Sequence, residues 1–453
     1  MIPALHRLVL FGFLVILGGC SYEFDMEITK ARPTETRHAP LLNTNNYPKA
    51  IEDGYYLDVE RYLDRNSDLV EEHAKAELAL GQILLYRGKI EEAAEHLLRA
   101  RDRAGSLEVK SRSNWFLTLC YYYLNRFAIS AFYAEEARHT GVQIDEGFIA
   151  FLKKGANRNL YRMDGTEAKV SMTYNQPRLP FLSVVVNGSE ARAVVDTGAS
   201  MTIISSSLAE ELGIQIDPEM KSWGYGLHQK KIDLHFAYLD TLRLGEITVY
   251  EVPVMVFPDE DLIFQTRRGT LKIDVALGYH LLRQGRLFLD YRAKILQWVP
   301  ASTMEPLEDQ NLFVTGLRPS AMVAINEAFG YHFILDTGSE KTFLSTSGSN
   351  RSSTQEKINF YKMIFHGFGK ARTVNLKAGD LLMALAGYQA AFKDIPVNRE
   401  SSSLIDGYVG NDFLSNFQVM LDFPHGRISL TPYRLARAEI VAEPEKEPTQ
   451  TQP

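Results

Sequence analysis

Asp196-Thr197-Gly198 ends the apolar run Ala193-Val194-Val195 and is followed by Ala199-Ser200. The same pattern returns about 140 residues later in Phe333-Ile334-Leu335-Asp336-Thr337-Gly338-Ser339. An apolar run that ends in an aspartate, a hydroxyl residue and a glycine is typical of a strand that enters a tight turn. Asp-Thr-Gly should occur by chance on the order of a tenth of a time in a chain of this length. Two copies, each after a strand, therefore indicate one site made of two parts.

The segments downstream of the two turns also correspond, which predicts an internal duplication with halves at 165–303 and 310–434. The pairs are a glycine-flanked aromatic, an apolar segment that ends in glycine, and an aspartate before a hairpin: Gly224-Tyr225-Gly226 and Gly367-Phe368-Gly369, Ala276-Leu277-Gly278 and Tyr408-Val409-Gly410, and Leu289-Asp290-Tyr291 and Leu421-Asp422-Phe423. Glycine, proline and β-branched residues are frequent here, and the pattern is that of short strands.

Both halves resemble the retropepsin-like fold of aspartic peptidases, the pepsin and retropepsin superfamily. In that fold a strand carries Asp-Thr/Ser-Gly, a hairpin forms a flap, and an apolar-apolar-Gly segment crosses near the catalytic strand. The resemblance implies two all-β, closed-barrel domains that form a pseudo-dimer within one chain. It implies Asp196 and Asp336 as the catalytic pair. The second half departs from the family at Glu340, where a small or hydroxyl residue is more usual.

The resemblance also assigns supporting roles. Thr197 and Thr337 would brace the two turns by hydrogen bonds, and Gly198 and Gly338 would let the backbones approach closely. Ala199 and Ser339 complete the turns. The aromatics of Gly224-Tyr225-Gly226 and Gly367-Phe368-Gly369 would be flap tips that close over an extended peptide; the alternative is an ordinary hairpin with a packed aromatic side chain.

Two carboxylates held about 3 Å apart can hydrolyse an amide without a metal, because they share one proton and act as base and acid together. The sequence contains no zinc-ligand spacing, and we expect no cofactor. The leading hypothesis is an aspartic endopeptidase that acts on an extended peptide or protein. One alternative is a non-catalytic peptide-binding or envelope-assembly lipoprotein that keeps the fold. Another is an enzyme whose halves pair between chains instead of within one.

The N-terminus resembles a bacterial lipoprotein signal. His6 and Arg7 precede an apolar run from Leu8 to Leu17 that is too short to span a bilayer, and Leu17-Gly18-Gly19-Cys20 follows. The resemblance implies a signal peptide at 1–19, lipidation of Cys20 and, with Ser21 next to it, an outer-membrane protein facing the periplasm. A plain secretory signal with an incidental cysteine is the alternative. Residues 20–50 lack periodicity and predict a tether without regular structure.

Residues 51–158 have apolar side chains at three- and four-residue spacing, which predicts helices over 74–86, 90–100, 115–124 and 128–137. The breaks at Arg87-Gly88-Lys89 and Asn125-Arg126 lie 37 residues apart, a spacing that resembles tetratricopeptide repeats; a plain helical bundle is the alternative. Such a surface could hold a protein partner. The formal net charge of -7 offers no basic surface for nucleic acid. Residues 435–453 predict a disordered tail.

Overall fold

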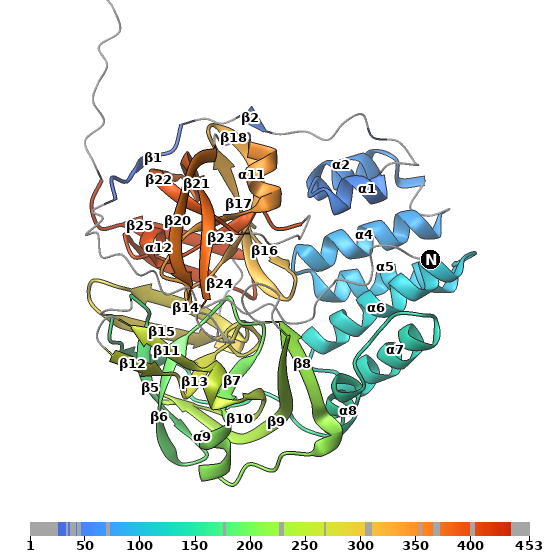
Figure 1. The fold of residues 1–453 in the computed structure, drawn as a ribbon. Helices are drawn as coiled ribbons and strands as arrows, with labels where there is room; N and C mark the ends of the chain where they lie inside the picture. The colour runs from blue at the N-terminus through green and yellow to red at the C-terminus, as the bar shows by residue number, and fades with distance from the viewer. Residues whose placement is uncertain are drawn as a thin grey trace, which may run out of the picture.

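The fold is that of a computed structural model (Figure 1). The structure describes residues 26–32, 35–36, 42, 47–68, 73–174, 178–225, 231–266, 269–303, 310–352, 356–365, 372–398 and 404–435. The predicted signal peptide with Cys20 lies outside these residues. So do the flap residues Gly226 and Gly367-Phe368-Gly369, and nearly all of the predicted tail.

The first folded unit is helical, as predicted. Apolar residues at helical spacing bury one or more faces of each helix, and successive helices pack against one another. Tight turns at Gly88 (φ 75°) and Asn125 (φ 56°) separate helices where the sequence predicted breaks. The tetratricopeptide assignment remains a prediction. The helices are α1 (Tyr47–Glu52), α2 (Tyr56–Arg65), α4 (Ala74–Tyr86), α5 (Ile90–Asp102), α6 (Leu107–Tyr123), α7 (Phe127–His139) and α8 (Glu146–Gly155).

The first β-domain is a closed six-stranded barrel in which β10, β7, β13, β6, β5 and β9 pair in a ring. Strands β3 and β8 extend it, and β11 and β12 form a separate hairpin. Its strands are β3 (Arg162–Asp164), β5 (Phe181–Val186), β6 (Ser189–Val195), β7 (Thr202–Ser205), β8 (Lys221–Tyr225), β9 (Lys231–Leu244), β10 (Ile247–Phe257), β11 (Ile263–Thr266), β12 (Gly269–Lys272) and β13 (Val275–Leu277). Its helices are α9 (Ser206–Glu211) and α10 (Tyr279–Leu282), with 3-10 turns η2 (Pro218–Met220), η4 (Asp259–Asp261) and η5 (Ala301–Thr303).

The second β-domain repeats this ring with β22, β19, β23, β18, β17 and β21. Strands β16 and β20 extend it as hairpin partners of β17 and β21. The duplication read from the sequence is therefore a duplication of the barrel. Its elements are β16 (Leu312–Thr315), β17 (Arg318–Ile325), β18 (Ala328–Leu335), β19 (Phe343–Ser345), α11 (Thr346–Ser352), β20 (Glu356–Phe365), β21 (Arg372–Leu385), β22 (Tyr388–Asn398), β23 (Gly407–Val409) and α12 (Asn411–Leu414).

A separate five-stranded sheet joins the two barrels. Its central strands, one from each half, pair antiparallel, with Phe288 opposite Met420. The side chains of Arg286 and Asp422 form an ion pair across this junction, with Arg286 Nε 2.8 Å from Asp422 Oδ2. The sheet therefore fixes the two halves to each other within one chain. Its strands are β4 (Ala168–Ser171), β14 (Gly285–Asp290), β15 (Ile295–Pro300), β24 (Phe417–Asp422) and β25 (Arg427–Pro432).

The helical unit lies along both barrels (Figure 1). Its early helices pack on the second barrel, where Tyr56 contacts the rings of Phe313 and His332. Its later helices pack on the first barrel, where the ring of Phe151 in α8 stacks on Phe236 with centroids 4.5 Å apart. These contacts are aromatic and buried, so the helices form part of the same packed body.

The segment predicted as a tether differs from the prediction. Two short strands, β1 (Thr29–Lys30) and β2 (Glu35–Thr36), pair with β22 and with β18 at the second barrel. Ile28 is buried beside them. Such strands add to exposed sheet edges through backbone hydrogen bonds, which need no sequence periodicity, so the composition gave no sign of them.

Candidate active site

The two aspartates occupy equivalent places at the ends of β6 and β18. The Asp196 N–H donates to the carbonyl of Leu277 at 3.0 Å, and the Asp336 N–H donates to the carbonyl of Val409 at 3.0 Å. Leu277 and Val409 end β13 and β23, which pair in parallel with the two aspartate strands. The apolar-apolar-Gly segments of the sequence therefore hold the start of each turn.

The threonines that follow the aspartates link the two turns. The Thr197 N–H donates to Thr337 Oγ1 at 3.1 Å, and the Thr337 N–H donates to Thr197 Oγ1 at 3.1 Å. Each hydroxyl also donates to the opposite strand, Thr197 to the carbonyl of Leu335 at 2.6 Å and Thr337 to that of Val195 at 2.8 Å. Both threonines are fully buried. The network lets neither turn move without the other.

The glycines make room for the carboxyl groups. A Cβ added at Gly198 would lie 2.5 Å from Asp336 Cγ, and one added at Gly338 would overlap the carboxyl of Asp196. Each aspartate is also held by its own turn: Asp196 Oδ1 accepts from the Ala199 N–H at 3.0 Å, and Asp336 Oδ1 from the Gly338 N–H at 2.9 Å. The two carboxyl groups thus lie side by side, close enough to share a hydrogen bond.

Burial sets the protonation of this pair. Both side chains are 0% exposed. Desolvation raises the pKa of Asp196 to about 7 and raises the pKa of Asp336 well above its usual value, with the neighbouring Asp196 charge as a second cause for Asp336. Two such groups titrate as one system and hold a proton in common. The pair can therefore supply one base and one acid at the same time.

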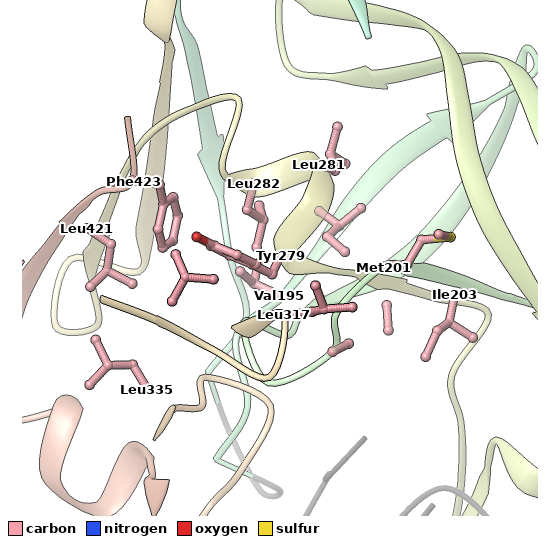
Figure 2. Packing of buried hydrophobic residues seen from close by; sticks show 14 of the residues in the cluster. Val195, Met201, Ile203, Tyr279, Leu281, Leu282, Leu317, Leu335, Leu421 and Phe423 are labelled. Carbon is pink, nitrogen blue, oxygen red and sulfur yellow. The ribbon is translucent and has the colours of Figure 1, made fainter. Parts of the chain in front are cut away.

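Apolar side chains from both halves pack together in a core cluster that includes Val195 and Leu335, the residues before the two aspartates (Figure 2). Val195 and Tyr279 come from the first half, and Leu335 and Phe423 from the second. The Tyr279 and Phe423 rings meet edge to face, with centroids 5.3 Å apart. Asp196 and Asp336 are themselves fully buried, and this burial is the largest cause of their raised pKa values.

The first predicted flap is described in part. Gly224 and Tyr225 lie in β8 and pair with Ile232 and Lys231 of β9, so they approach the tip of a hairpin. Strands β20 and β21 form the corresponding hairpin of the second half. Helix α8 packs against the base of the first hairpin. The tips at 226–230 and 366–371 lie outside the described residues.

Glu340 contributes to the junction of the two halves. Its Oε1 accepts a hydrogen bond from the backbone N–H of Arg178 at 2.5 Å. Arg178 precedes β5 of the first barrel, so the side chain in which the sequence departs from the family pattern reaches across to the other half. The sequence marks Glu340 only as a departure from the family pattern, and its partner could not be predicted, because that partner is a backbone group 162 residues away.

Two further residues of the site were not singled out from the sequence. The Asn411 side chain donates to the carbonyl of Thr337 at 2.7 Å and accepts from the Tyr291 hydroxyl at 2.8 Å, which ties the second turn to the first half. Arg318, only 4% exposed, lies near both carboxyl groups. The sequence shows that Asn411 follows Gly410 and that Arg318 precedes Pro319. Only the strand pairing in the structure shows which residues lie next to them. Among the described residues, no group of histidine, cysteine, aspartate and glutamate side chains could hold a metal ion.

Comparison with known proteins agrees with this geometry. Residues 182–281, which include Asp196 and most of the first barrel, match a family model described as aspartyl protease. The chain resembles the retropepsin-like aspartic peptidases. The matched range ends before the second barrel, whose six-stranded ring repeats the first. No curated protein is significantly similar in sequence to this chain.

Solved structures that are similar to this chain include the following two. One is a retropepsin-like aspartic protease from Rickettsia conorii, with 20% identity over 30% of this chain and 92% of that chain, and a TM-score of 0.21. The other is an aspartic proteinase from Irpex lacteus, with 13% identity over 60% of this chain and 99% of that chain, and a TM-score of 0.36.

Proposed function

We propose that this chain is an aspartic endopeptidase in which Asp196 and Asp336 together activate water against a peptide bond. The observation that supports it best is the pair of buried carboxyl groups, each held by its own turn and packed against the glycine of the other. Buried acids of this kind are costly to a fold and are typical of functional sites. A structural role for the pair would be served better by apolar residues.

The chemistry follows from one shared proton. The ionised carboxylate takes a proton from water while the oxygen attacks the carbonyl carbon, and the protonated carboxyl donates its proton to the carbonyl oxygen. Collapse of the tetrahedral intermediate then breaks the C–N bond, and the amine leaves with the proton that the first carboxylate had taken. As the C=O bond re-forms, one hydroxyl of the intermediate returns its proton to the second carboxylate. The pair ends with one proton, as it began, so no metal or other cofactor enters the balance.

The test compares the wild type with Asp196→Asn and Asp336→Asn on a diverse peptide library between pH 4 and pH 8. Asp240→Asn, at an exposed aspartate outside the site, is the matched control. Each dyad variant should lose cleavage and keep its circular dichroism spectrum, while the control keeps full activity. Full activity in either dyad variant would overturn the shared dyad. A wild type that binds library peptides and cleaves none at any pH would favour the non-catalytic alternative.

The proposed setting is the bacterial cell envelope, with the chain anchored through lipid on Cys20 and facing the periplasm from the outer membrane. The support is the sequence Leu17-Gly18-Gly19-Cys20-Ser21. No helix in the described part of the chain is long and apolar enough to cross a membrane. Mass measurement of the N-terminal peptide, with Cys20→Ser as the control, tests the lipid, and membrane fractionation tests the location. An unmodified Cys20 in membrane-free fractions would contradict the proposal.

The helical unit is proposed to recruit or orient a protein substrate or partner. It packs on both barrels, so a molecule bound to it would lie close to the site. Cross-linking of the purified chain to cleaved substrates, followed by mapping of the linked residues, tests this role. Links confined to the barrels would contradict it.

A further inference from the structure

Arg318 is a buried cation next to the dyad. The antiparallel register of β17 and β18 places Ser320 opposite Ile334 and Ala321 opposite Phe333. When this register is extended by two residues toward the site, Arg318 lies opposite Asp336. Residues opposite one another in an antiparallel pair have Cα atoms about 5 Å apart. A long side chain at this position can therefore reach the carboxyl groups.

The guanidinium is held in place by Tyr408. Arg318 Nη1 donates to the Tyr408 hydroxyl at 3.0 Å, and the guanidinium carbon lies 5.4 Å from the centre of the Tyr408 ring. Tyr408 belongs to β23, pairs with Ile334, and stacks on the ring of Phe343 with centroids 4.4 Å apart. The cation is thus fixed by a strand that itself supports the Asp336 turn.

The first half has a leucine at the equivalent position. There, Phe181 lies opposite Val194 and Leu182 opposite Ala193, so the same extension brings Leu179 opposite Asp196. Leu179 is 0% exposed. A proline follows in both halves, Pro180 after Leu179 and Pro319 after Arg318, which supports the equivalence. The two halves supply the same Asp-Thr-Gly turn but differ in this neighbour, so the site receives one fixed positive charge.

A fixed charge has a direct consequence for a buried acid pair. A guanidinium stays protonated in proteins, and a positive charge nearby favours the ionised form of a carboxyl group. The Arg318 charge lowers the pKa of both Asp196 and Asp336, against the larger upward effect of burial. Titratable groups of the described residues that face Arg318 include Tyr408 and, from helix α6, Tyr123, and both are neutral when their phenol groups are protonated.

We propose that Arg318 is a positioning residue that keeps one carboxyl group of the Asp196–Asp336 pair ionised, and so preserves the base that the reaction needs. The inference rests on the proposed peptidase function for its kinetic consequence, but the protonation of the pair can be measured without it. Without the cation, burial would hold both carboxyl groups in the protonated form up to a higher pH, and the base would be missing.

The experiment measures the pH profile of kcat/KM for the full chain with a peptide that the wild type cleaves. Arg318→Met should move both limbs of the profile upward by at least about one pH unit, the shift expected for a unit charge about 10 Å away at an effective dielectric constant of about 20; a closer charge gives a larger shift. Activity one unit below the wild-type acidic midpoint should fall about tenfold. Arg318→Lys keeps the charge and should restore most of the profile. Arg286→Met, at a partly buried arginine of the junction sheet, is the matched control and should leave both midpoints in place.

The carboxyl titration of ¹³C-aspartate-labelled protein, read by NMR, separates this inference from the proposed function. If the wild type cleaves no peptide, the peptidase proposal fails, while the titration of the pair in wild type and Arg318→Met still decides the role of Arg318. Should Arg318→Met not fold, Tyr408→Phe, which removes the hydrogen bond at 3.0 Å, should shift the titration in the same direction by a smaller amount. Unchanged titration midpoints in a folded Arg318→Met, or in Tyr408→Phe where Arg318→Met does not fold, would overturn the proposal.

Discussion

Thr197 and Thr337 exchange backbone-to-hydroxyl hydrogen bonds of 3.1 Å in both directions, although 140 residues separate them in the chain. Each hydroxyl accepts from the other turn and donates to the other strand. The two halves are therefore joined at the one place where the carboxyl groups must be aligned. A local motif that occurs twice becomes a single rigid base for the dyad.

Removal of one hydroxyl should weaken both the fold and the site. Thr197→Val leaves the buried Thr337 N–H without its acceptor, which costs about 1–3 kcal/mol. Chemical denaturation should show this loss, whereas Thr197→Ser, which keeps the hydroxyl, should stay close to the wild type. The double variant with Thr337→Val should lose less than the sum of the two single variants, since both act on one network. Strict additivity would contradict the coupled arrangement.

Substitution of the turn glycines should abolish activity with the fold retained. The methyl group of Gly198→Ala would lie 2.5 Å from Asp336 Cγ and push the carboxyl groups apart. A displacement of about 1 Å at reacting groups costs on the order of 100-fold in rate, so kcat/KM should fall at least that far. Gly105→Ala, where nothing lies within 4 Å of an added Cβ, is the control. A Gly198→Ala variant with kcat/KM within a few fold of the wild-type value would contradict the close approach of the two turns.

The duplicated halves, the strands before the two turns and the helical region could be predicted because each depends on local pattern. The pairing of Asp196 with Asp336 followed from the symmetry that the duplication implies. The strands at Thr29–Lys30 and Glu35–Thr36 could not be predicted, since edge pairing leaves no periodic signal in so short a segment. The place of Arg318 beside the two aspartates could not be predicted either, because it depends on a strand register that only the structure supplies.

Helix α8 should control the stability of the hairpin that β8 and β9 form. A Cβ added at Gly147 would overlap the backbone carbonyl of Lys221 at the start of β8, and a backbone atom cannot move aside as a side chain can. Gly147→Ala should cost about 1–3 kcal/mol through overpacking and should raise hydrogen exchange in β8 and β9. Faster exchange spread evenly over both barrels would instead indicate global destabilisation, and unchanged exchange in β8 would contradict the contact.

Glu340 should act through the junction and not by obstructing the site. Glu340→Gln keeps an acceptor for the Arg178 N–H and should leave stability and activity near wild-type values. Glu340→Ala removes the acceptor and should destabilise the chain by about 1–3 kcal/mol, measured by denaturation. A Glu340→Ala variant that is more active than the wild type would show that the side chain impairs catalysis, contrary to this expectation.

The raised pKa values of the dyad make a prediction for stability as a function of pH. The pKa of Asp196 is about 7 in the folded chain and that of Asp336 is also raised, whereas both are near the ordinary carboxyl value of 3.8 when unfolded. Folding therefore favours the protonated forms. The contribution of the two carboxyl groups to the free energy of unfolding is fully present below about pH 4. It declines as the pH rises toward 7, because ionisation of a buried carboxyl group opposes folding.

The comparison of wild type with Asp336→Asn isolates the titration of the pair, because asparagine does not ionise and the titrating groups outside the pair are common to both chains. The free energy of unfolding of the variant, relative to that of the wild type, should increase by a few kcal/mol between pH 4 and pH 7, since one pKa unit corresponds to about 1.4 kcal/mol. Denaturation at each pH measures the difference. If this difference in free energy of unfolding stays constant or decreases with rising pH, the pair is not desolvated. Only a carboxyl group whose pKa is higher in the folded chain than in the unfolded chain gives a difference that grows with pH.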